Sequence, residues 1–426
     1  MSERRWSLVT FLVAGVAFVA VAAWLIPWHP VPGGTPGPVP QTQVFSTAQI
    51  ARANDYSDPA RYLAWASYAV SMVVALLLGF TSWGSRVVGR LRGWWWIRVL
   101  VAVVALALIG RLVTLPFAII GHHRSVGYGL STQDWASWTS DLVKNLALSV
   151  VFTFLLVVVL VGFARKWPRA WPAVAGGFLG CLVMVGSFVY PVLVEPQFNH
   201  FTPMTAGPMR SDIFDLAKTE HVHIDDVLVA DASRRTTTLN AYVSGFGSTR
   251  RVVVYDTVLK DLPRDQILAI VAHELGHAHH DDVLIGSILA ALGTAAGIGL
   301  LGIALSAVRR RPLARGRPNV LGDPTAVPLL LALVAIGMFL SSPIDNGLSR
   351  KIETRADVAS LEATRDPAAF IRMQRALDLH SLSDTPVTWS QFWFGSHPTT
   401  LQRIAIAEQL GRRMGTSVTD RGITPK

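Results

Sequence analysis

The sequence has few charged residues and a single cysteine. Charged residues make up 15% of its 426 residues, whereas an average soluble protein has about 25%. Its one cysteine, Cys181, excludes an intrachain disulfide and a cysteine-based zinc site. We also find no glycine-rich phosphate-binding loop and no internal repeat. With 51% apolar residues and a mean hydropathy of +0.40, the composition favours a membrane protein.

Apolar runs long enough to cross a bilayer are abundant. A transmembrane helix needs about 20 mostly apolar residues. Seven runs approach or reach this length, at about 7–26, 63–80, 97–120, 145–164, 173–194, 283–308 and 326–344. For the last two, a helical hairpin packed on the other spans is an alternative to full crossings. The sequence therefore predicts a mainly α fold, a multi-pass transmembrane bundle of about seven spans that contacts the lipid bilayer.

Basic residues are concentrated in four segments that fall on one side of this predicted bundle. One precedes the first span, and the others follow the second, fourth and sixth spans: Arg4 and Arg5; Arg86, Arg90, Arg92 and Arg98; Arg165, Lys166 and Arg169; Arg309, Arg310, Arg311, Arg315 and Arg317. Cytoplasmic loops carry an excess of Lys and Arg, so we expect these segments inside the cell. The net charge of +10 comes largely from these segments, and attraction to anionic lipid explains it. We therefore expect no nucleic-acid partner.

The most informative short motif is His273-Glu274-Leu275-Gly276-His277. Positions four apart lie on one face of an α-helix, so both imidazoles can reach one tetrahedral Zn²⁺. Glu274 is turned about 100° from His273 by the helical period. It is therefore placed to accept a proton from water that the metal activates, as a general base does.

The flanking sequence supports a helix here. Pro263 stands where a first turn tolerates proline, and Ile267, Ile270 and Val271 repeat at helical spacing. His279 and His280 are weaker metal candidates, because the chain lacks the Gly and His that the longer three-histidine motif requires. The third ligand must come from elsewhere in the chain.

Glu353 is the best candidate for that ligand. Glu353 and Asp357 stand four residues apart in a predicted helix, so the first can bind a metal while the second supports a ligand histidine. Taken alone, such a stretch is more often a solvated charged face. With the histidine motif, it predicts a site for one Zn²⁺ per chain, held by His273, His277 and Glu353.

Four blocks in the same order resemble the membrane zinc metalloproteases of the gluzincin class, which include the type I CAAX prenyl endopeptidases and the bacterial heat-shock membrane protease. The blocks are residues 239–259, the histidine motif, residues 353–357, and Ser396-His397-Pro398 with Arg403-Ile404. The resemblance covers about residues 205–410 in detail. One departure is Ala278, where eukaryotic prenyl proteases have an aromatic residue.

The resemblance assigns roles to further residues. Residues 236–254 alternate as a β-hairpin does, and the family pairs the strand Asn240-Ala241-Tyr242 with an extended substrate. The pattern alone allows an ordinary hairpin equally well. His397 lies before Pro398 in a predicted loop, where it can stabilise the oxyanion of the reaction. Family position also suggests that Arg403 supports the region of Asp357.

Together these observations predict an integral-membrane zinc-dependent endopeptidase that cleaves peptide or membrane-protein substrates. Residues 1–195 would form a membrane domain with five spans, and residues 196–426 a gluzincin-like α+β zinc peptidase domain that includes the last two membrane helices. The alternatives are a quality-control protease for membrane proteins, or a non-catalytic scaffold or transporter with a structural zinc site.

The side of the membrane is where charge and resemblance disagree. Eukaryotic prenyl proteases place the zinc domain in the cytosol, which would require the N-terminus, with Arg4 and Arg5, to lie outside. We follow the charges and expect an extracytoplasmic catalytic domain in the cell membrane. The sequence does not predict the oligomeric state.

Overall fold

The computed structural model describes residues 1–245, 247–308, 321–383 and 385–416. Phe246, in the predicted hairpin, and the basic run from Arg309 to Arg317 lie outside these residues. In the described part of the chain, seven helices are long and apolar enough to span a membrane, as the sequence predicts. Their bounds are α1 Glu3–Leu25, α2 Thr47–Phe80, α4 Trp95–Gly127, α5 Trp135–Lys166, α6 Trp171–Leu193, α10 Asp282–Val308 and α11 Val327–Thr364.

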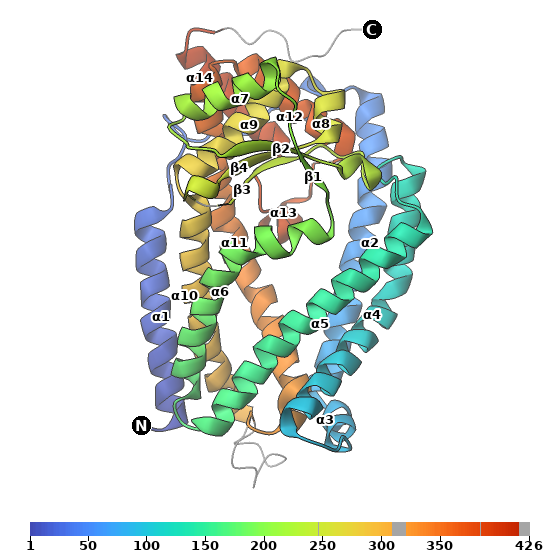
Figure 1. Cartoon of the computed structure of the whole chain (residues 1–426), viewed down its shortest axis with the longest axis vertical. Helices are drawn as coiled ribbons and strands as arrows, with labels where there is room; N and C mark the ends of the chain where they lie inside the picture. The colour runs from blue at the N-terminus through green and yellow to red at the C-terminus, as the bar shows by residue number, and fades with distance from the viewer. Residues whose placement is uncertain (246, 309–320, 384, 417–426) are drawn as a thin grey trace.

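The spans run along the length of the molecule, and the mixed α/β part lies at one end (Figure 1). The start of α1, the short helix α3 (Ser82–Gly89) and the connection between α5 and α6 lie at the opposite end. The fold is thus the multi-pass helical bundle with a small α+β part that the sequence predicts.

The α+β part contains a four-stranded sheet in the order β1-β2-β4-β3. The strands are β1 Phe201–Pro203, β2 Asp226–Ala230, β3 Ala241–Ser244 and β4 Arg251–Tyr255. β2 and β4 are parallel, whereas β1 and β3 are antiparallel to their neighbours. The predicted hairpin is therefore present as β3 and β4, although it begins at Ala241 because Thr236 pairs with Ser131 of the α4–α5 loop instead.

Six helices accompany the sheet: α7 Pro208–Thr219, α8 Asp256–Asp261, α9 Arg264–His279, α12 Pro367–Ser381, α13 Thr388–Phe394 and α14 Thr400–Arg413. Apolar side chains of these helices, α13 excepted, and of β2, β3 and β4 form one core in which Leu275, Phe370 and Ile404 are fully buried. Val31 and Val44, from the connector after α1, join the same core. A separate core among the spans contains the buried side chains of Leu160, Trp171, Leu305 and Leu330.

Close helix packing in the membrane part depends on small residues. A Cβ at Gly299 would lie 2.5 Å from the backbone nitrogen of Phe11, and one at Gly302 would lie 2.4 Å from Ser7 Oγ. Only glycine therefore lets α1 approach α10 this closely, which is how small residues act in transmembrane interfaces.

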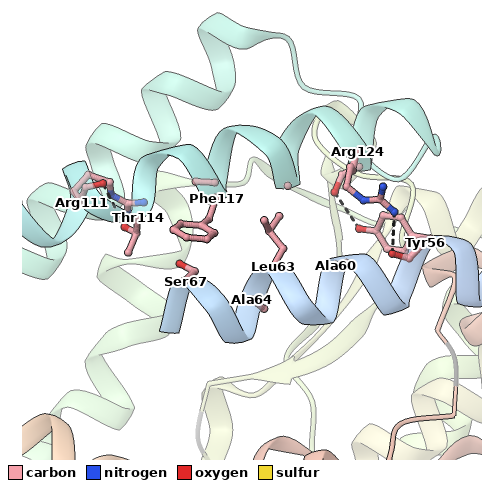
Figure 2. Close-up of a pocket in the computed structure, with 12 residues that line it drawn as sticks. Tyr56, Ala60, Leu63, Ala64, Ser67, Arg111, Thr114, Phe117 and Arg124 are labelled. Carbon is pink, nitrogen blue, oxygen red and sulfur yellow. Dashed lines mark hydrogen bonds between the residues drawn. The ribbon is translucent and has the colours of Figure 1, made fainter. Parts of the chain in front are cut away.

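A groove of about 300 Å³ lies between α2 and α4 (Figure 2). Arg111 lies toward one end of the view, and Tyr56 and Arg124 lie at the other, where Arg124 donates to the carbonyl oxygen of Asp55 at 2.9 Å. The lining between them is largely apolar and includes Ala60, Leu63, Ala64, Phe117, Ala118 and Gly121. All residues that line the groove come from these two helices, and none belongs to the site described next.

Candidate metal centre

The helix α9 presents His273 and His277 on one face. Their Nε2 atoms are 3.3 Å apart, and the two rings lie at 88° to each other. α9 begins directly after Pro263, which is its N-cap, and Leu275, between the two histidines, points into the core. The four-residue spacing therefore gives the geometry that the sequence predicts.

Glu353 reaches this pair from α11. Its Oε2 is 3.2 Å from His273 Nε2, and its Oε1 is 3.6 Å from His277 Nε2. Gly276 makes this approach possible, because a Cβ at this position would already lie 3.0 Å from the Cβ of Ala359 on α11. The two helices thus bring together residues that are far apart in the sequence.

These three side chains fit a metal ion. One ligand atom from each lies within 4.8 Å of the others. Ligands bound tetrahedrally at about 2.1 Å lie roughly 3.4 Å from one another, close to the three distances found here. Glu353 Oε2 is also buried without a hydrogen-bond partner among the described residues, as expected of an atom that would face a cation.

A carboxylate holds the far nitrogen of each imidazole. Asp357 Oδ1 lies 3.0 Å from His273 Nδ1, and Asp282 Oδ2 lies 2.9 Å from His277 Nδ1. In a neutral ring, Nδ1–H then donates to the carboxylate, and Nε2 keeps its lone pair. Two lone pairs and the Glu353 carboxylate converge, and a cation between them would remove their repulsion.

Two arginines support these carboxylates. The side chain of Asp357 is fully buried, and Arg403 donates to it through Nε at 2.9 Å and through Nη2. Arg355 donates to Asp282. Each buried carboxylate therefore has a cationic partner, which offsets part of the cost of removing its charge from water.

The surroundings shift the pKa values of the helix α9 groups. Burial lowers the pKa of His277, but its contacts with Asp282 and Glu353 outweigh this and raise the pKa to about 10. Burial likewise opposes charge on His273, and Asp357 and Glu353 raise its pKa nonetheless. Both shifts favour the protonated form of the ring, so a metal ion must compete with protons for these nitrogens. Burial raises the pKa of the Glu274 carboxyl, although both histidines oppose the shift.

His397 lies beside the metal-facing residues, in the loop between α13 and α14. Its Nε2 is 3.3 Å from Glu353 Oε2, and its side chain is 57% exposed. Desolvation lowers the pKa of His397, which favours a neutral ring. Ser396 Oγ is 2.9 Å from Nδ1, so Ser396 can donate there and leave the proton on Nε2, facing the site.

The predicted substrate strand lies at an edge of the sheet. Ala241 and Tyr242 belong to β3, which pairs only with β4 among the described strands, and Asn240 directly precedes it. β3 also contacts α9. The Tyr242 hydroxyl donates to Glu195 at 3.4 Å, so this side chain is directed to the end of α6.

The two weaker metal candidates, His279 and His280, do not join the metal-facing group. His279 Nδ1 bonds the Glu220 carbonyl, and His280 ends the helix α9.

The sequence does not predict a role for Asp282 or Arg355. Asp282 is the first residue of α10, just after the turn that follows the second histidine. The signal for Asp282 would have been its place in the sequence, because a carboxylate shortly after a helix that ends near a predicted metal ligand can bond to that histidine. Arg355 lies between Glu353 and Asp357, where its charge resembles that of an ordinary solvated helix face.

Two family models together match most of the chain. Residues 203–410 match peptidase family M48, and residues 35–200 match the model described as CAAX prenyl protease N-terminal, five membrane helices. The chain belongs to peptidase family M48. It is accordingly a multi-pass membrane metalloendopeptidase, and the metal of this family is generally zinc. A non-catalytic scaffold or transporter is therefore excluded.

One relative and one solved structure match nearly the whole chain, and a second relative matches part of it. An uncharacterized metalloprotease of Bacillus subtilis, YhfN, is 29% identical over 423 residues, which cover 95% of this chain and 97% of that protein. CAAX prenyl protease 1 of Saccharomyces cerevisiae is 29% identical over 174 residues, or 40% of this chain and 38% of that one. The crystal structure of S. mikatae Ste24p has the same fold, with a TM-score of 0.76, 20% identity, and coverage of 95% and 99% of the two chains.

Proposed function

We propose that this metalloendopeptidase binds one Zn²⁺ through His273, His277 and Glu353 and uses Glu274 as its general base. The observation that carries the proposal is the convergence of two imidazole nitrogens and one carboxylate at 3.2 to 3.6 Å. Two nitrogens and one oxygen leave the fourth tetrahedral position open, as catalytic zinc sites do.

The chemistry divides between the metal and the side chains around it. Bound zinc supplies Lewis acidity that activates water and polarises the scissile carbonyl. Glu274 accepts the proton of the attacking water and returns it to the leaving amine. The raised pKa of Glu274 suits both transfers, because it brings the carboxyl closer to the working pH.

Other residues hold the site or face the substrate. His397 donates from Nε2 to the oxygen on which negative charge develops. Asp357 and Asp282 keep the two ligand rings oriented, and Arg403 fixes Asp357. These roles give a reason for the fully buried carboxylate of Asp357, whose charge is costly to remove from water.

We propose that residues 196–426 form the peptidase domain and that substrates bind as extended chains along β3. An edge strand has unpaired backbone groups that can bond to a peptide. The relatives named CAAX prenyl protease match smaller parts of this chain than YhfN does. We therefore propose that this chain cleaves peptide bonds in peptides or membrane proteins, and we propose no more specific substrate.

Removing and restoring the metal tests this function. Purified enzyme treated with a chelator should lose cleavage of denatured casein, and about one equivalent of Zn²⁺ per chain should restore it. Calcium serves as the control, because imidazole ligands favour zinc over that cation. Full activity in protein shown by mass spectrometry to be metal-free would refute the proposed mechanism.

A further inference from the structure

The loop that carries His397 follows a short aromatic helix, α13, which lies against α11. Trp393 of α13 stacks on Phe339 of α11 with ring centroids 4.8 Å apart, and its indole nitrogen donates to the Phe339 carbonyl at 3.1 Å. A seven-residue helix is too short to be stable alone. These contacts with α11 must therefore determine where α13 ends and the His397 loop begins.

Three polar residues of α11, each one turn after the last, hold the end of α13. The last carbonyl groups of a helix have no partner within it. Here Ser342 and Asn346 both donate to the Trp393 carbonyl, at 2.7 Å each. Arg350 donates through Nη1 to the Gln391 carbonyl at 3.1 Å and to the Gly395 carbonyl. One guanidinium thus bonds both the helix and the loop that follows it.

The same contacts extend to His397. Gln391 donates through Nε2 to the His397 carbonyl at 2.6 Å, so the backbone at His397 is bonded to the helix that Arg350 holds. Arg350 also lies three residues before Glu353 on α11. One turn of α11 therefore carries both Glu353, a predicted metal ligand, and Arg350, which holds the loop of His397.

We infer that Arg350 is a positioning residue that acts through His397 and sets the distance of its Nε2 from the reacting carbonyl. This inference rests on the proposed role of His397. Arg350 contacts neither the metal-facing nitrogens nor Glu353 among the described interactions, and its guanidinium bonds to backbone carbonyls. Its effect should therefore appear in turnover and not in metal binding.

A double-mutant cycle tests the inference. Arg350→Ala should reduce kcat with little change in KM or zinc content, by up to the 100- to 1,000-fold typical of losing an oxyanion donor. His397→Ala should cause a loss of similar size. The double variant should lose little more activity than either single variant, because both substitutions remove the same interaction, that of His397 with the reacting carbonyl. Guanidinium chloride at non-denaturing concentration should partly restore Arg350→Ala but not the double variant. Lys351→Ala, the neighbouring cation, is the matched control.

Each outcome has a separate meaning. Losses that multiply in the double variant, or zinc loss in Arg350→Ala, would refute the role of Arg350 while leaving the proposed function intact. Full activity of His397→Ala would instead refute the role of His397 on which the inference rests. If Arg350→Ala does not fold, Asn346→Ala removes another donor to the end of α13, the one that bonds the Trp393 carbonyl, and the cycle with His397→Ala can be measured on that variant.

Discussion

At the scale of single residues, the site depends on two layers of side chains. A metal-binding imidazole almost always donates its other ring N–H to an acceptor, which fixes the orientation of the ring. Asp357 and Asp282 provide these acceptors at 3.0 and 2.9 Å. Arg403 and Arg355 in turn hold the carboxylates. Orientation of the metal ligands therefore depends on residues that never face the metal.

This layering gives a ranked prediction for metal binding. Glu353→Ala should weaken zinc binding more than Asp357→Ala, since the first substitution removes a ligand and the second only the support of His273. Loss of such support typically weakens binding by about 10- to 100-fold. Competition with a zinc chelator on the purified variants measures both affinities. Equal affinities would mean that Glu353 is not the third ligand.

The sequence predicts Asp357 and Arg403 as supports of the site, but not Asp282 and Arg355. The histidine motif has a fixed helical spacing, so its geometry follows from the period of the helix. Asp282 belongs to a different helix, which begins after a left-handed residue, Asp281 with φ 53°. The direction of the chain after that turn decides whether Asp282 meets His277, and no short-range pattern records it.

At the scale of elements, α11 is the part of the fold that the sequence described least completely. The sequence predicts a span at about 326–344 and a helix around Glu353 and Asp357, and does not show that the two are joined. The structure has one continuous helix of 38 residues, with Pro343 inside it. A proline commonly ends or kinks a helix in a sequence pattern, yet transmembrane helices tolerate it. This continuity carries Glu353 directly from the bundle to α9.

The edge of β3 gives a prediction about substrate binding. The Tyr255 amide donates to the Asn240 carbonyl, so the alternation of an antiparallel ladder directs the backbone groups of Ala241 and Val243 to the open edge. Val243→Pro should therefore keep the fold but remove one edge donor, and raise KM or lower kcat/KM for peptides. Proline is tolerated at such outward-facing edge positions.

Tyr242→Pro is the matched contrast for that experiment. Its amide is directed to β4 by the same alternation, so this substitution should lower thermal stability, whereas Val243→Pro should not. Peptide kinetics beside thermal unfolding in detergent separate the two effects. Unchanged kcat/KM in a folded Val243→Pro variant would argue against strand pairing as the mode of substrate binding.

At the scale of the whole molecule, basic segments lie at one end of the bundle. The start of α1, with Arg4 and Arg5, and the helix α3 lie at the end opposite the metal centre (Figure 1). Cytoplasmic segments carry the excess of basic residues. We propose on this basis that the metal centre lies on the extracytoplasmic side, the reverse of the cytosolic arrangement that the family resemblance implies.

Reporter fusions test this orientation. A reporter active only after export should give a signal when fused after Lys426 and none when inserted between Arg309 and Arg317. A cytosolic reporter at the same two positions should give the opposite pattern and provides the control for expression. Export of the insertion between Arg309 and Arg317, with no signal from the fusion after Lys426, would place the metal centre in the cytosol.

The measurement that tests the central claim most directly combines zinc content and peptide cleavage in Glu274→Gln. The substitution removes the proton acceptor while His273, His277 and Glu353 remain, so the purified variant should hold about one zinc per chain. Its cleavage of denatured casein should fall to background, because the proposed proton acceptor is absent. Turnover near the wild-type rate in a variant that still holds zinc would contradict the account.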